Sequence, residues 1–113
     1  MNPVERDTAE RYAWGAGCDG WHLVQDAELS VIEERMPPGA AEARHRHRRA
    51  QQFFYVLSGR ADFELDGQTL ALGPGQGVRV PPGAPHQILN PGPDALRFLV
   101  ISQPPSHGDR EPA

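Results

Sequence analysis

Short apolar runs alternate with turn residues along most of the chain. From Trp21 onward, segments rich in Val, Ile, Leu, Phe and Tyr are separated by clusters of Gly, Pro, Asn and Asp. This pattern predicts many short strands in a sandwich or barrel, and nothing in it suggests a parallel sheet covered by helices. Asp66-Gly67 is a strong signal for a two-residue hairpin. The expected strands are Trp21–Gln25, Leu29–Met36, Ala41–His47, Gln52–Leu57, Ala61–Leu65, Gln68–Leu72, Gly77–Val80, His86–Leu89 and Leu96–Ser102.

The two ends of the chain lack this pattern. Residues 1–20 show little periodicity and are expected to form an N-terminal arm, with a short helix near Thr8–Trp14. Residues 103–113 are Pro-rich and polar and are expected to form an extended or frayed C-terminal tail. We therefore predict an all-β protein with a single barrel domain over residues 21–102.

Composition narrows the classes of function. The chain has 113 residues, with 12 Gly, 12 Pro and a formal net charge of -4, so binding to nucleic acid or to a membrane surface is not expected. Cys18 is the single cysteine, which excludes an internal disulfide and a cysteine metal cluster. Met1–Arg11 is polar, and no window approaches the roughly 18 apolar residues of a membrane span. We expect a cytoplasmic protein.

Three histidines and a glutamine are the candidate metal ligands. His45 and His47 are two positions apart, so on a strand both side chains leave the same face. Gln52 opens the next expected strand and offers an amide oxygen, and His86 begins a strand far along the chain. If the fold joins these strands, three nitrogens and one oxygen can bind one divalent transition metal and leave positions for water or substrate.

The histidine pair also allows a simpler interpretation. Residues 44–49 read Arg-His-Arg-His-Arg-Arg, which is equally typical of a basic solvated run or a phosphate-binding patch. On a strand, however, alternate arginines lie opposite the histidines and leave a separate ligand face. His86 adds a distant third ligand, whereas His22 and His107 have no partner at an informative spacing and are expected to be ordinary polar residues.

Two motifs resemble those of the cupin superfamily. The first reads Gly39, five residues, His45-Arg46-His47, four residues, Gln52, six residues, Gly59. The second reads Gly75, five residues, Pro81-Pro82-Gly83, two residues, His86, three residues, Asn90. The resemblance implies a jelly-roll β-barrel with one metal ion in its mouth, held by His45, His47 and His86, and with Zn, Ni, Mn and Fe as candidate metals.

Gln52 occupies a position where most cupins have glutamate. A glutamate would reduce the formal charge of the site from +2 to +1, and a glutamine leaves it at +2. Such a site is more Lewis-acidic and stabilises a higher oxidation state less well, which favours a non-redox enzyme on a small organic substrate, such as an isomerase, epimerase, lyase or cyclase-like enzyme. The alternatives are an iron-dependent dioxygenase and a metal-containing small-molecule binding or sensor module without catalysis. The sequence does not indicate which faces Glu33, Glu34 and Arg97 occupy, so it assigns no general acid or base.

Strand parity indicates which side chains lie near the metal. With Gln52 and His86 facing inward, Phe54, Val56 and Ile88 share their faces and are candidates to line the pocket. Such residues fill the interior of a small barrel more often than they touch a substrate.

The opposite face of the same strand carries Phe53, Tyr55 and Leu57. A soluble monomer rarely exposes such a row, so we predict that this face is buried against a second copy in a twofold homodimer. Light scattering should then give twice the 12.4 kDa mass of the chain. A monomeric mass would contradict the prediction.

Overall fold

The computed structural model describes residues 2–113, and all regular structure in that range is β-strand. The strands are β1 (Glu10–Trp14), β2 (Cys18–Gln25), β3 (Ser30–Met36), β4 (His45–His47), β5 (Gln51–Ser58), β6 (Ala61–Leu65), β7 (Gln68–Leu72), β8 (Gly77–Val80), β9 (His86–Leu89), β10 (Leu96–Gln103) and β11 (Arg110–Pro112). Within the same residues, no helix is long and apolar enough to cross a membrane.

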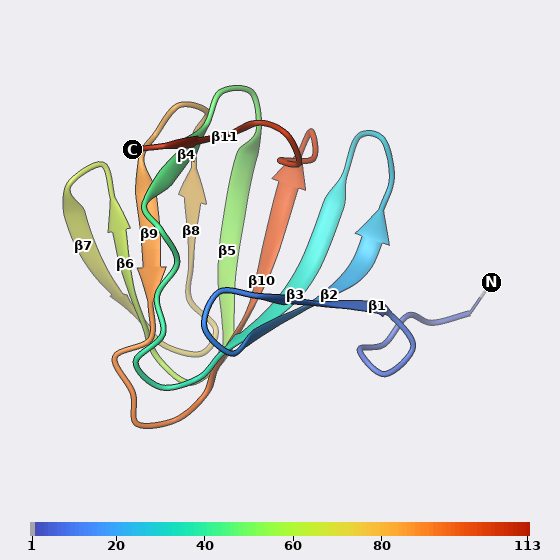
Figure 1. Cartoon of the computed structure of the whole chain (residues 1–113), viewed down its shortest axis with the longest axis horizontal. Helices are drawn as coiled ribbons and strands as arrows, with labels where there is room; N and C mark the ends of the chain where they lie inside the picture. Colours follow the sequence, from blue (N-terminus) through green and yellow to red (C-terminus); the bar gives the residue numbers. More distant parts are fainter. Residues whose placement is uncertain (1) are drawn as a thin grey trace.

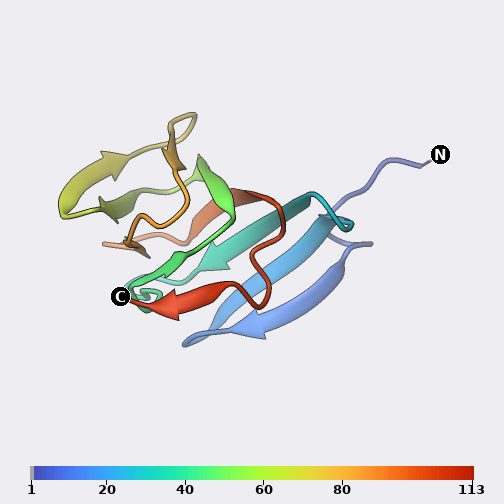
Figure 2. The same cartoon turned by 90° about the horizontal axis from the view of Figure 1, so that it is seen from above.

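The strands form two antiparallel sheets that face each other (Figure 1). The larger sheet has the order β1-β2-β3-β10-β5-β8, and the smaller has the order β11-β4-β9-β6-β7. The chain passes repeatedly from one sheet to the other, as in a jelly roll. Figure 2 shows β1 and β2 (blue) extending the larger sheet past the smaller one. The predicted all-β jelly-roll fold is confirmed.

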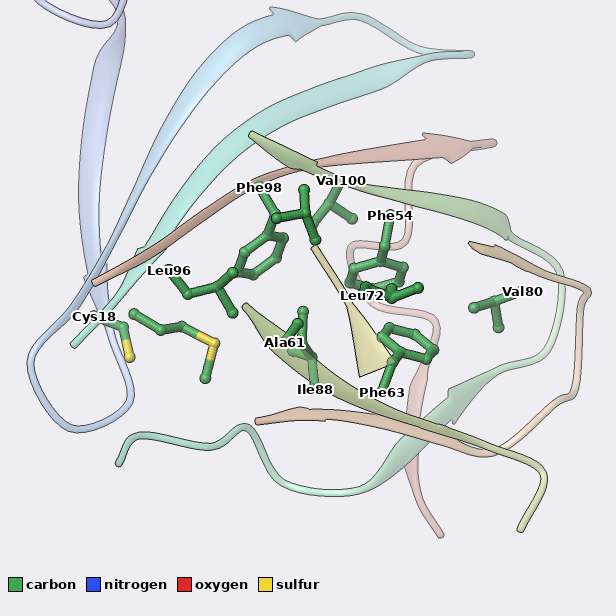
Figure 3. Close-up of a cluster of buried hydrophobic side chains, with 12 residues drawn as sticks. Cys18, Phe54, Ala61, Phe63, Leu72, Val80, Ile88, Leu96, Phe98 and Val100 are labelled. Carbon is green, nitrogen blue, oxygen red and sulfur yellow. The ribbon is translucent and has the colours of Figure 1, made fainter. Parts of the chain in front are cut away.

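The core lies between the two sheets (Figure 3). Phe54 of the larger sheet packs against Phe63 of the smaller, with ring centroids 4.8 Å apart. Phe98, Val56 and Ile88 complete the same cluster and are almost fully buried. The alternating burial along β10 follows from the period of two that the sequence shows. Inward side chains of both sheets thus fill one continuous core.

The predicted hairpin turn forms between β6 and β7. Asp66 and Gly67 both have positive φ, 49° and 90°. A two-residue turn of this kind matches the twist of the flanking strands, and glycine adopts positive φ without strain.

The predicted helix near Thr8–Trp14 is wrong. Residues Glu10–Trp14 form β1, which pairs with β2 through a register that sets Tyr12 opposite Gly20. An isolated helix of this length is marginal in water, whereas an added strand gains a ladder of hydrogen bonds. The boundary expected at residue 21 therefore falls inside β2, and part of the expected arm is sheet.

The tail expected to be extended or frayed contains the strand β11. It pairs with β4, the strand of the two histidines. The Asp109 carboxylate accepts backbone N–H bonds from Arg48, Arg49 and Ala50 at 2.9–3.2 Å. Glu111 adds ion pairs with Arg46 and Arg48. The acidic tail is therefore held by the basic segment that precedes β5.

The strand expected at Ala41–His47 is shorter, because β4 begins at His45 and Ala41 makes only an isolated bridge with Leu89.

The outer face of β5 carries the residues on which the expected homodimer rests. Phe53 is 39% exposed, and its ring stacks on Tyr55. The homodimer stays a prediction.

Candidate metal centre

Strand pairing brings the three candidate histidines together. His45 of β4 lies directly opposite His86 of β9 in the antiparallel ladder. Their ring centroids are 4.5 Å apart, and the His47 ring lies 4.9 Å from His45 and 5.8 Å from His86. Each residue offers a ligand atom within 4.8 Å of the others. Three histidines are therefore grouped so that they can bind one metal ion.

The arginines of the same segment point away from this group. His45 and His47 are buried, whereas Arg46 between them is exposed. Arg44 pairs with Glu64, and Arg46 pairs with Glu111. The two interpretations of the sequence thus describe the two faces of one strand: a solvated basic face and a buried histidine face.

Hydrogen bonds to backbone carbonyls orient two of the imidazoles. His45 Nδ1 donates to the Ala43 carbonyl at 2.8 Å, and His86 Nδ1 donates to the Ala84 carbonyl at 3.0 Å. A carbonyl only accepts, so Nδ1 carries the proton and Nε2 keeps its lone pair. The His86 Nε2 atom is buried and has no partner among residues 2–113. This arrangement is the one that histidine ligands of metals use.

Burial keeps the imidazoles neutral. It lowers the pKa of His45 to about 4 and also lowers the pKa values of His47 and His86, and neighbouring imidazoles act in the same direction on His45 and His47. At neutral pH, therefore, no proton has to leave before a metal binds.

Gln52 belongs to the opposite sheet and lines one cavity together with His45 and His47. Its side chain is buried, and its Nε2 donates to the Ser102 hydroxyl at 3.0 Å, across the β5–β10 pair. That bond turns Oε1 away from Ser102, and within the described chain Oε1 is buried without a hydrogen-bond partner. A buried polar atom of this kind is rare unless a ligand satisfies it. The three imidazoles and this amide oxygen fit a divalent transition metal.

A cavity of about 280 Å³ opens beside this group. His45, His47, Gln52 and Phe54 line it, and Val56 and Ile88 lie deeper, in the core. The sequence did not identify the remaining polar residues of the lining. They are Tyr12, Glu34, Glu42, Ser102, Ser106, His107 and Arg110.

Two glutamates of the cavity hold their protons unusually strongly. Burial raises the pKa of Glu34 to about 7, although the hydrogen bond from the Tyr12 hydroxyl, 2.9 Å long, lowers it in part. Burial and the nearby Glu34 raise the pKa of Glu42 to about 8. Burial and Glu34 also raise the pKa of Tyr12, so this hydroxyl stays protonated. Near neutral pH, Glu34 is therefore able to gain or lose a proton.

A glycine positions the Tyr12–Glu34 pair. A Cβ on Gly20 would overlap Cζ, Cε1 and the hydroxyl oxygen of Tyr12. Only glycine leaves room for the ring to lie across β2 and reach Glu34 on the next strand.

The structure also decides the faces that the sequence left open. Glu34 faces the cavity, on the same side of β3 as Ile32. Glu33 bonds with Arg97 at 2.7 Å and lies near Arg6, outside the cavity. The apolar Ile32 and Met36, which have the same parity as Glu34, were the signal available in the sequence.

A jelly roll with three inward histidines defines a class of metal-binding β-proteins, and comparison with known families agrees with it. A model of the cupin domain matches residues 32–102. The chain belongs to the cupin family.

Individual proteins resemble this chain over part of its sequence or in fold. An uncharacterized protein of Methanocaldococcus jannaschii, MJ1618, is 32% identical over 91 residues, which cover 80% of this chain and 73% of that protein. The polyketide synthase CurC of Streptomyces cyaneus is 33% identical over 69 residues, covering 61% of this chain and 45% of CurC. The structure of the polyketide cyclase RemF from Streptomyces resistomycificus superposes with a TM-score of 0.86 at 21% identity, covering 100% of this chain and 85% of RemF. At that identity the superposition shows a shared fold.

Replacing His86 with alanine should release the metal. The substitution removes a buried ligand opposite His45, so we expect the affinity for zinc to fall by at least about 100-fold, more than the loss of an outer partner costs. The midpoint of thermal unfolding should also lose its dependence on added metal. Elemental analysis by mass spectrometry measures the first effect. Unchanged metal content in His86→Ala would contradict the assignment.

Replacing Gln52 with glutamate should tighten metal binding. The carboxylate adds a negative charge beside the cation, so we expect divalent affinity to rise by about tenfold or more. The Ser102 hydroxyl can rotate and donate to the new carboxylate, so the substitution is compatible with the fold. Competition with a chromogenic chelator measures the affinity. Weaker binding would mean that Gln52 is not a ligand.

Proposed function

We propose that this cupin is a non-redox, divalent-metal-dependent enzyme that moves a proton on a carbon next to a carbonyl group of a small organic substrate. This step is shared by isomerases, epimerases, lyases and cyclases. His45, His47, His86 and Gln52 would hold the ion. A bound divalent ion supplies Lewis acidity, which polarises a carbonyl oxygen.

One observation carries this proposal: the Glu34–Tyr12 pair lines the same cavity as His45, His47 and Gln52. A general base must lie within reach of the substrate and must ionise near the working pH. Glu34 meets the second requirement with a pKa of about 7, and its place in the cavity wall supports the first. In this role, the Glu34 carboxylate accepts the proton from carbon, and the Tyr12 hydroxyl holds the carboxylate in position.

The neutral ligand set supports non-redox chemistry over oxygen activation. Three imidazoles and one amide contribute no negative charge, so a higher oxidation state of the metal is poorly stabilised. The names of the relatives agree in part, because RemF is a polyketide cyclase and CurC is a polyketide synthase. We therefore favour a cyclase-like or isomerase-like reaction on an oxygenated substrate.

Proton exchange with solvent tests the proposal. Protein loaded separately with Zn, Ni, Mn or Fe is incubated in D₂O with hydroxyketones, sugar acids and aromatic β-diketones. NMR then follows the loss of C–H signals beside the carbonyl. We expect Glu34→Gln to slow exchange by about 10²–10⁴-fold with unchanged metal content. Oxygen uptake by the iron form, without proton exchange in any form, would contradict the proposal and favour a dioxygenase.

The rate of the same exchange should depend on pH in a defined direction. The base is the ionised form of Glu34, so the rate should rise with pH, reach half its maximum near the pKa of about 7 and level off above it. A bound cation lowers this pKa, so the inflection should lie at or below that value. Tyr12→Phe removes the hydrogen bond that lowers the pKa, and the inflection should move to higher pH. A profile that Tyr12→Phe does not shift would exclude Glu34 as the base.

A further inference from the structure

A second cavity of about 420 Å³ adjoins the cavity of the metal centre. Tyr12, Ile32, Ser106 and His107 line both cavities. The other walls of the second cavity come from β2, the turn that follows it, the start of β3 and Pro105. None of the four candidate metal ligands lines it.

The His22 side chain lines this second cavity. Its Nδ1 atom is buried and has no hydrogen-bond partner in residues 2–113. Protein encloses this nitrogen, so a ligand in the cavity would meet other parts of the His22 ring. The sequence alone indicated an ordinary polar residue, because no partner histidine stands at an informative spacing.

A β-bulge accompanies His22. His22 pairs with Ile32, whereas Val24 pairs with Val31, so Leu23 is the extra residue of β2. Bulges of this kind re-aim a side chain and are frequent beside binding sites. The local backbone therefore departs from a regular ladder at the residue that lines the cavity.

Tyr12 connects the two cavities. Its hydroxyl donates to Glu34 on the metal side, and its ring lies 5.0 Å from the His22 ring at an interplanar angle of 37°. Both residues line the second cavity, where the two rings together offer an aromatic surface. Such a surface suits a planar ring.

We propose that the two cavities bind one extended substrate of two or three fused or linked rings. One end, with an oxygen pair, would occupy the metal centre beside Glu34. The far ring would pack on Tyr12 and His22. This inference rests on the proposed function. The cavity at the metal measures about 280 Å³. That volume lies just below the range of about 300–1,000 Å³ that ligand sites usually measure, so a substrate of several rings would need the second cavity as well.

The test compares catechol with alizarin (1,2-dihydroxyanthraquinone). Both carry the same metal-binding oxygen pair, and alizarin adds the fused rings that the second cavity would hold. Calorimetric titration of the zinc-loaded protein should show alizarin binding at least about tenfold more tightly, because more apolar surface is buried.

Two variants act on the second cavity alone. Ser30 and His22 line it but not the metal cavity. We expect Ser30→Trp, which fills the cavity, and His22→Ala to weaken alizarin binding by about tenfold, while zinc content and catechol affinity stay within about twofold of the parent protein. Gln68→Ala, on an exposed position of β7 in the other sheet, is the matched control and should change neither affinity.

The outcomes separate this inference from the proposed function. Equal affinities for catechol and alizarin, or alizarin binding that neither variant weakens, would overturn the two-cavity inference and leave the metal centre intact. Absence of zinc and of catechol binding would contradict the proposed function instead. In that case, alizarin binding to the metal-free protein that Ser30→Trp removes would still support the second cavity.

Discussion

The burial of three imidazoles and an amide between two sheets is the constraint on which the rest of this structure depends. Buried polar atoms are unfavourable unless each finds a partner. Two backbone carbonyls satisfy Nδ1 of His45 and His86, and the Ser102 hydroxyl satisfies the Gln52 amide. Among the atoms left without a partner in residues 2–113, His86 Nε2 and Gln52 Oε1 are those that would face a cation, and His47 Nδ1 also has none. The fold thus satisfies the outer side of His45, His86 and Gln52 and leaves their inner side to the metal.

The aromatic core stabilises the same arrangement from behind. The His86 ring lies parallel to Phe63 at 6.0 Å and meets the edge of Phe54 at 5.7 Å. These contacts restrict the imidazole and exclude water, which also accounts for its lowered pKa. One cluster of side chains therefore serves both stability and the protonation state of the site.

The C-terminal segment completes the mouth of the barrel. After β10 the chain returns to the smaller sheet as β11, beside the histidine strand (Figure 1). On the way it contributes Ser106, His107 and Arg110 to the cavity at the metal. The bonds of Asp109 to the β4–β5 connection hold this segment in place, and they lower the pKa of its carboxyl group. A short acidic tail thus becomes part of the site because a basic segment lies opposite it.

The sequence by itself determined the all-β class, most strand positions and the four candidate ligands, because strand parity and motif spacing are local properties. His45 and His47 share a face for that reason alone. The acidic half of the cavity was decided by the tertiary structure. Glu34 and Tyr12 meet only because β1 pairs with β2 and β2 with β3, and Arg110 arrives from the far end of the chain. The raised pKa values of Glu34 and Tyr12 result from burial, and burial depends on which surfaces pack together. Such pairings join residues distant in sequence, so no local pattern records them.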